Sequence, residues 1–217
     1  MTLSQNQRIA AMAILGGAFA ILLVLVWNGE TNTIDMALRN WTLSFNTPTA
    51  VAIWEGFSTM GSIVVLGGLT FFSLGLFVVR RDWFAERQIA FAMGGAVGLD
   101  TIVKWIVHRP RPDEIYANTM PASYSFPSGH ALLGLTFYIS IAIIVSRHGR
   151  GNLTKAIWGG AVVMFALIGM SRIFLGVHYA SDVLGGYLIA AFWLAFLMVP
   201  AAADHNNPIS SNKKDAT

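Results

Sequence analysis

The sequence predicts an all-α membrane protein, a bundle of six transmembrane helices with a short interfacial helix in the first outer loop. Of its 217 residues, 55% are hydrophobic and 12% are charged, whereas soluble domains carry about 25% charged residues. The mean hydropathy is +0.59, and the apolar residues are gathered in six long blocks. The blocks lack the apolar–polar alternation of strands, so helices are the expected spanning elements.

A helix that crosses a bilayer needs about 20 residues, and the apolar blocks are close to this length. The first, Ile9–Trp27, has 19 residues without a charge and is followed by Asn28, Gly29 and Glu30. No small-residue cleavage site follows it, so we interpret it as a retained span and not as a signal peptide. Some later blocks are shorter and need their flanks to span. The remaining blocks are Phe57–Val79, Ile89–Val107, Ala131–Ser146, Ala156–Ser171 and Val183–Val199.

The connection between the first two blocks, residues 28–55, is the longest in the chain. Ile34, Leu38, Trp41 and Phe45 recur in it at helical spacing. One apolar stripe among polar residues predicts a short amphipathic helix that lies at the membrane interface.

Lysine and arginine predict the orientation, because cytoplasmic loops carry an excess of both. We therefore expect both termini in the cytoplasm and the remaining basic residues on the outer face of the inner membrane. Residues 1–202 are expected to form one membrane domain, and the polar stretch 203–217 a disordered cytoplasmic tail. Nine of the fourteen basic residues fall on the predicted cytoplasmic side: Arg8, Arg80, Arg81, Arg87, Arg147, Arg150, Lys155, Lys213 and Lys214.

Several ionisable residues lie on the predicted outer side at the ends of apolar blocks, where charges are expensive and mark function. One cation there could extend its head group into water, but a group of them favours a binding site. Cysteine is absent, which excludes thiolate catalysis, and no basic stripe indicates a nucleic-acid partner. The group consists of Lys104, Arg109, Arg111, His130, Arg172, His178 and Asp182.

The segment Pro127–His130 directly precedes the fourth block and predicts an anion site. Ser128 is a favoured residue for the N-cap of a helix. The amides of Gly129 and His130 would then be free donors at the positive helix end, and glycine lets an anion approach the backbone. An ordinary capped helix start is the alternative.

Two pairs of residues are spaced so that their side chains share a helical face. Asp182 lies four residues after His178, and a carboxylate at this spacing fixes the tautomer of an imidazole and raises its basicity. Such an imidazole suits a nucleophile or base, although a polar cap on the last helix would look the same. Asp100 lies four residues before Lys104 and is expected to hold the lysine toward an anion. Arg172 could bind two oxygens of a phosphate.

Cations, a helix N-terminus, two histidines and a carboxylate together suit the hydrolysis of a phosphate ester, whose catalysis is mostly charge stabilisation and positioning. Three spaced motifs, complete and in order, resemble those of the type-2 phosphatidic acid phosphatase superfamily. The length and the six blocks are similar to its bacterial membrane branch. The motifs are Lys104 with Arg111-Pro112, Pro127-Ser128-Gly129-His130, and Ser171-Arg172 with His178 and Asp182.

The resemblance implies a role for each motif residue. His178 would be the nucleophile that forms a phosphohistidine, and Asp182 would orient it. His130 would protonate the leaving oxygen and then activate water. The resemblance implies no metal and no cofactor. Arg109 lies in the variable stretch of the first motif and is left outside the core. The phosphate would be held by Lys104, Arg111, Ser128, Gly129 and Arg172, with Asp100 in support.

These features predict a membrane phosphatase that acts on a lipid phosphate or diphosphate, with the bilayer as its other partner. The expected outer-face site favours undecaprenyl diphosphate. Phosphatidylglycerol phosphate, phosphatidate, diacylglycerol diphosphate and lipid A remain open. Soluble vanadium haloperoxidases share the superfamily, but six apolar blocks argue against one. An inactive lipid-binding or transport protein is the other alternative, and both catalytic histidines argue against it.

Overall fold

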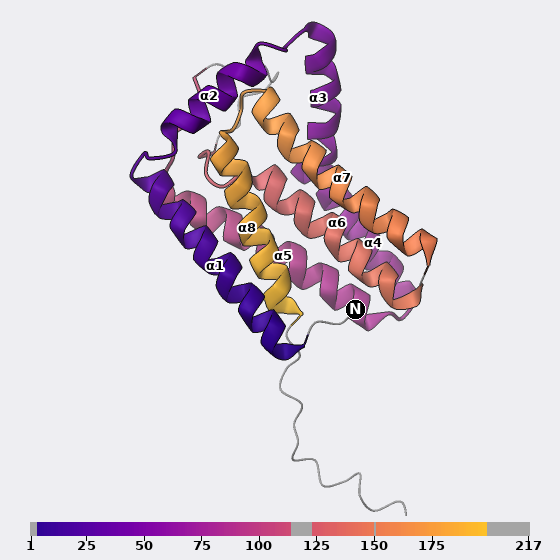
Figure 1. The fold of residues 1–217 in the computed structure, drawn as a ribbon. Coiled ribbons are helices and arrows are strands. Elements are labelled where there is room, and N and C mark those ends of the chain that lie inside the picture. The colour runs from indigo at the N-terminus through magenta and orange to yellow at the C-terminus, as the bar shows by residue number, and fades with distance from the viewer. Residues whose placement is uncertain (1–3, 114–122, 150, 199–217) are drawn as a thin grey trace, which may run out of the picture.

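The structure, a computed structural model, describes residues 4–113, 123–149 and 151–198, and these residues form eight α-helices and no strand (Figure 1). The predicted all-α fold is therefore confirmed. The predicted tail, residues 203–217, lies outside the described residues. The helices are α1 (Gln5–Trp27), α2 (Asn32–Leu43), α3 (Pro48–Met60), α4 (Ile63–Val79), α5 (Trp83–Val107), α6 (Gly129–His148), α7 (Asn152–Phe174) and α8 (Ala180–Leu197).

Six segments of the described chain are long and apolar enough to cross a membrane, namely α1, the pair α3–α4, α5, α6, α7 and α8. Their number confirms the six predicted spans, and the shorter blocks gain length from their flanks as expected. Large apolar side chains are exposed on the outside of the bundle, for example Ile14 at 70% and Phe71 at 77%. Such surface is stable against lipid and not against water, so the chain is a multi-pass membrane protein.

The second span is broken, which the sequence reading of Phe57–Val79 as one block did not predict. Thr47 caps α3, and Pro48 occupies its first turn. The helix ends at Gly61, and α4 starts again behind Ser62, whose Oγ accepts a hydrogen bond from the Val65 amide at 3.3 Å. A Cβ atom on Gly61 would lie 2.3 Å from Cγ2 of Ile168. At the break, the backbone of Gly61 therefore packs directly against α7.

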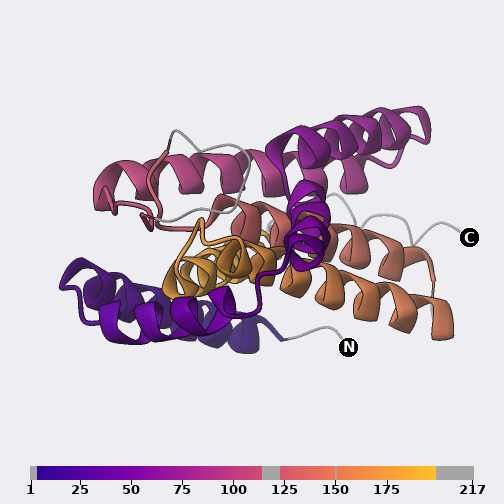
Figure 2. The same ribbon diagram turned by 90° about the horizontal axis from the view of Figure 1, so that it is seen from above.

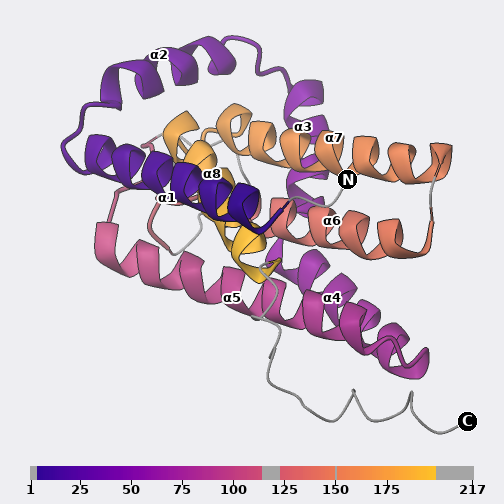
Figure 3. The same ribbon diagram turned by 60° about the horizontal axis from the view of Figure 1, so that its bottom comes forward.

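Helices α6 and α8 occupy the middle of the bundle, where α6 packs against α5, α7 and α8, and α8 packs against α1. Seen from above, α4 and α5 lie on one side and α1 and α2 on the other (Figure 2). The same order is visible in Figure 3, where α1 and α2 lie on the side away from α4 and α5. The core contains Leu66, Ile89, Phe126, Leu132 and Ile168, all inaccessible to solvent.

The predicted amphipathic helix of the first loop is α2, which confirms its existence and place. Ile34 and Trp41 are exposed, at 66% and 57%. Asp35 and Arg39 are buried on the opposite side, at 2% and 7% exposure. The apolar stripe therefore faces away from the protein and the polar stripe faces the bundle, the reverse of a helix on a soluble protein.

Candidate active site

The three motifs meet at one end of the bundle because successive spans run in opposite directions. Lys104 lies in the last turn of α5, and Arg172 lies in the last turn of α7. His130 and Asp182 lie in the first turns of α6 and α8. Two helix C-termini and two helix N-termini thus bring together residues that are distant in the sequence. This is the end of the bundle that α2 crosses (Figure 1).

A cavity of about 180 Å³ lies at this end and is lined by both histidines and by three cations. It brings together most of the residues grouped from the sequence, but Arg109, Ser128 and Asp182 do not line it. The lining residues are Gly61, Ile63, Asp100, Lys104, Arg111, Ser123, Gly129, His130, Leu133, Arg172 and His178.

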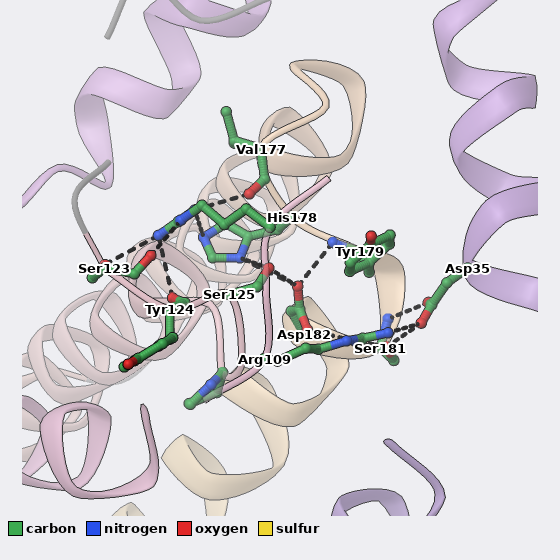
Figure 4. A network of polar contacts seen from close by, with 12 residues as sticks. Asp35, Arg109, Ser123, Tyr124, Ser125, Val177, His178, Tyr179, Ser181 and Asp182 are labelled. Carbon is green, nitrogen blue, oxygen red and sulfur yellow. Dashed lines mark hydrogen bonds and ion pairs between the residues drawn. The ribbon is translucent and has the colours of Figure 1, made fainter. Parts of the chain in front are cut away.

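His178 and Asp182 form a buried pair behind the cavity (Figure 4). Nδ1 of His178 lies 3.4 Å from Oδ2 of Asp182. The same oxygen accepts hydrogen bonds from Oγ of Ser125 at 2.5 Å and from the amide of Tyr179 at 2.9 Å. The carboxylate therefore closes the first turn of α8 and faces the imidazole at the same time. Because Nδ1 is directed at Asp182, Nε2 is the nitrogen directed toward the cavity.

The surroundings of His178 keep its imidazole neutral. Burial lowers the pKa of His178 to about 3, against the opposing effect of its hydrogen bond with Asp182, and the charge of Arg111 lowers it further. A neutral imidazole with Nδ1–H facing the carboxylate has its lone pair on Nε2. Nη1 of Arg111 lies 3.1 Å from that nitrogen. The two residues that the resemblance implies as nucleophile and phosphate-binding cation are therefore neighbours.

The three cations of the cavity are each anchored by oxygen atoms. Nζ of Lys104 contacts the carboxylate of Asp100 and donates to the carbonyl of Pro127 at 3.0 Å. Arg172 donates through Nη1 to Oγ of Ser58, while its buried Nε has no partner among the described residues. Each head group is thus fixed in place before an anion binds, which lowers the cost of binding.

Arg111 is held by two backbone carbonyls. It donates through Nε to the carbonyl of Ser123 at 2.6 Å and through Nη1 to the carbonyl of Val177 at 2.8 Å. Burial lowers the pKa of Arg111, and Asp182 and Asp100 oppose this effect. An arginine side chain starts from so high a pKa that it remains a cation at neutral pH.

Ser128 occupies the N-cap position of α6, as predicted, but the expected capping hydrogen bond is absent. Its φ and ψ are −72° and 111°, in the extended region. Its Oγ is buried without a partner among the described residues.

Sequence reasoning missed Arg109, Asp35 and Ser125. Arg109, placed outside the core, donates to Oδ1 of Asp182 at 2.6 Å and to Oδ2 of Asp35 at 2.7 Å. Asp35 and Arg39 are four residues apart on α2, and this polar stripe was a signal that the helix turns charges toward the protein. Nothing in the sequence singled out Ser125, which lies in an irregular segment.

Comparison with known proteins supplies the family. A family model described as the PAP2 superfamily matches residues 85–203, more than half of the chain, and contains all three motifs. The chain belongs to the PAP2 superfamily. The predicted family is confirmed, and with it the predicted enzyme class, a phosphoric ester hydrolase.

The PAP2 relatives include several lipid phosphatases. Phosphatidylglycerophosphatase B of Bacillus subtilis is 28% identical over 83% of this chain and 89% of its own length. Decaprenylphosphoryl-5-phosphoribose phosphatase of Mycobacterium tuberculosis is 33% identical over 66% of this chain and 76% of its own length. Undecaprenyl-diphosphatase of Sulfolobus acidocaldarius is 29% identical over 48% of each chain. Lipid phosphates are therefore the shared substrate class among these relatives.

Two solved PAP2 structures resemble this fold. The crystal structure of a transmembrane PAP2 type phosphatidylglycerolphosphate phosphatase from Bacillus subtilis superposes with a TM-score of 0.75, at 27% identity over 86% of this chain and 92% of that one. Aquifex aeolicus LpxE has a TM-score of 0.58 at 24% identity, over 76% of this chain and 93% of that one, and shows the fold alone.

Proposed function

We propose that this PAP2 protein hydrolyses a lipid phosphate through a phosphohistidine formed on Nε2 of His178. The observation that carries the proposal is the single cavity in which His130 and His178 meet Lys104, Arg111 and Arg172. Asp182 lies behind His178 at 3.4 Å, where it can orient the imidazole and stabilise the positive charge that develops on it.

The cavity suits a phosphate group. Lys104, Arg111 and Arg172 offset its negative charge, and Nε of Arg172 has no other partner among the described residues. The N-terminus of α6 adds the amides of Gly129 and His130, which a helix leaves free for an anion. A Cβ on Gly129 would lie 3.1 Å from Oδ1 of Asp100, so glycine leaves room for the carboxylate that contacts Lys104.

The reaction takes two steps. Nε2 of His178 forms a bond to phosphorus, the bond to the leaving oxygen breaks, and His130 gives that oxygen its proton. His130 then takes a proton from water as the water oxygen bonds to phosphorus and the phosphorus–nitrogen bond breaks. Inorganic phosphate leaves, and both histidines return to their starting states. The cations stabilise the charge of both transition states.

For the substrate, undecaprenyl diphosphate is our first candidate, because the site is expected on the outer face, where this lipid would be presented. Phosphatidylglycerol phosphate is the second, and the alignment with phosphatidylglycerophosphatase B over 83% of this chain favours it. Both present a phosphate on a lipid head group, so the same cavity serves either. The two lipids differ in the length of the head group and in the group that leaves when the phosphate is transferred.

A panel of lipids tests this proposal. Purified protein is supplied with undecaprenyl diphosphate, phosphatidylglycerol phosphate and phosphatidate in detergent, and released phosphate is measured. We expect turnover of at least one lipid, unchanged after EDTA, and none with the His178→Ala variant. Release of phosphate by that variant at the wild-type rate would contradict the proposed nucleophile.

A further inference from the structure

A buried chain of ion pairs connects α2 to the carboxylate behind His178 (Figure 4). Arg109 donates through Nη1 to Oδ1 of Asp182 at 2.6 Å and through Nη2 to Oδ2 of Asp35 at 2.7 Å. The three side chains are 8%, 0% and 2% exposed. Charges shielded from water interact strongly, and removing one leaves its partners uncompensated.

A second branch of this network runs through Ser181, the neighbour of Asp182 in the first turn of α8. Oδ1 of Asp35 accepts a hydrogen bond from the Ser181 amide at 3.0 Å, and Oδ2 accepts one from the Ser181 hydroxyl at 2.5 Å. The same hydroxyl accepts from Nη1 of Arg109 at 2.7 Å. Asp35 therefore fixes both the backbone beside Asp182 and the guanidinium that binds it.

The two oxygens of Asp182 have separate tasks. Oδ2 accepts hydrogen bonds from the Ser125 hydroxyl at 2.5 Å and the Tyr179 amide at 2.9 Å, and it lies 3.4 Å from Nδ1 of His178. Oδ1 accepts a hydrogen bond from the guanidinium of Arg109. Without that contact the carboxylate would lose its one charged partner at Oδ1, and only the neutral donors Ser125 and Tyr179 would hold its orientation toward the imidazole.

The guanidinium remains charged in this setting. Burial would lower the pKa of Arg109, but the charge of Asp182 and the hydrogen bond with Asp35 outweigh it and raise the pKa. The ring of Tyr179 also lies 4.3 Å from the guanidinium carbon, a favourable place for a cation. The link between α2 and Asp182 is therefore ionic at neutral pH.

We propose that Arg109 and Asp35 are positioning residues: Asp35 holds Arg109, and Arg109 holds Asp182 in the orientation that receives Nδ1–H of His178. Neither lines the phosphate cavity, so they act on the rate of phosphoryl transfer and not on phosphate binding. Helix α2 thereby takes part in catalysis although it lies outside all three motifs. This inference rests on the proposed function, since it requires His178 as the nucleophile.

Rapid-quench kinetics with labelled substrate test the positioning role in the Arg109→Lys and Asp35→Asn variants. We expect the rate of phosphohistidine formation to fall roughly 10- to 100-fold, because a misplacement of about 1 Å can cost about 10²-fold. The final amount of label per protein and the inhibition constant for inorganic phosphate should stay at the wild-type values. A merely structural role would instead reduce the amount of label.

Arg109→Gln alone leaves two buried carboxylates without their cation and can fold poorly for that reason. The double variant, Arg109→Gln with Asp35→Asn, removes one of those two charges and provides a second test. If Asp35 acts through Arg109, the double variant is no slower than Arg109→Gln alone, a non-additive result. Recovery of the wild-type rate in the double variant would show that Arg109 serves folding only, and would overturn the proposal.

Ile89→Ala is the matched control, because Ile89 is fully buried near the start of α5, far along that helix from Lys104. It should lower stability and leave the transfer rate of the folded enzyme unchanged. A wild-type transfer rate in Arg109→Lys would refute the positioning role while the proposed function stands. Absence of label in the wild type would instead refute the proposed function, and the inference with it.

Discussion

At the scale of single residues, the two histidines of the cavity differ in their surroundings. His178 lies against Asp182 and beside Arg111, an arrangement for a nucleophile. His130 lies at the N-terminus of α6 among the same cations, and no carboxylate within the described part of the chain forms a hydrogen bond or ion pair with it. The proposed role of His130 as the acid that protonates the leaving oxygen comes from its place in the second motif, and it predicts a dependence on the leaving group.

We predict that His130→Ala slows the hydrolysis of an alkyl lipid phosphate far more than that of p-nitrophenyl phosphate. An alkoxide needs a proton in the transition state, whereas nitrophenolate leaves without one, and general acid catalysis contributes about 10² to 10⁴ in rate. A lipid diphosphate should fall between them. Rapid-quench measurement of the first transfer is required, because the proposed mechanism also gives His130 a role in the second step. An equal loss for every leaving group would limit His130 to phosphate binding.

Asp100 gives a second prediction at this scale. Asp100→Asn keeps the shape of the side chain but removes the charge that holds Lys104 at the cavity. We expect the KM for a lipid phosphate to rise about fivefold, corresponding to ~1 kcal/mol for a weakened charged hydrogen bond. The midpoint of thermal unfolding should change little. Steady-state kinetics on the purified variant measure this, and an unaltered KM would refute the role.

At the scale of elements, the break between α3 and α4 shapes one wall of the cavity. Gly61 lines the cavity and lies close to α7, so that an added Cβ would be 2.3 Å from Ile168 and 3.3 Å from Cδ2 of His130. The signals for the break were present in the sequence, since glycine commonly ends helices and Ser62 favours an N-cap. Because apolar residues lie on both sides of Gly61 and Ser62, the sequence suggested one continuous helix there.

We predict that Gly61→Ala destabilises the protein by about 1–3 kcal/mol through overpacking, and lowers phosphatase activity by displacing His130. Gly68→Ala is the control, because no atom lies within 4 Å of the Cβ it would add. Thermal unfolding in detergent and phosphate release measure the two effects. If both variants behave alike, the close contact at Gly61 has no functional importance.

At the scale of the whole molecule, the sequence predicted what depends on local spacing. The spans, α2 and the motif residues are each visible as patterns within a few turns. The ion pair of Arg109 with Asp35 joins residues 74 positions apart, so no spacing rule could reveal it. Ser128 lies at the N-cap of α6 as predicted, but the residue type alone did not show that its hydroxyl makes no capping hydrogen bond.

The arrangement of the helices also supports a prediction of topology. The directions of the spans place Arg8, Arg80, Arg81, Arg87 and Arg147 near the helix ends opposite the cavity. The excess of positive charge at that end predicts that it is cytoplasmic, and that both termini are cytoplasmic as well. A fluorescent protein fused at Thr217 should therefore fluoresce, and alkaline phosphatase at the same place should be inactive. Active alkaline phosphatase there would reverse the topology and remove the argument for undecaprenyl diphosphate.

Covalent labelling of His178 tests the central claim most directly. Wild-type protein and the His178→Ala variant are mixed with lipid substrate labelled in the phosphate that is released, and the reaction is quenched within the first turnover. A phosphohistidine is labile in acid and stable in base, so we predict acid-labile, base-stable label on the wild type and none on the variant. Equal label on the His178→Ala variant would contradict the account by placing the nucleophile elsewhere.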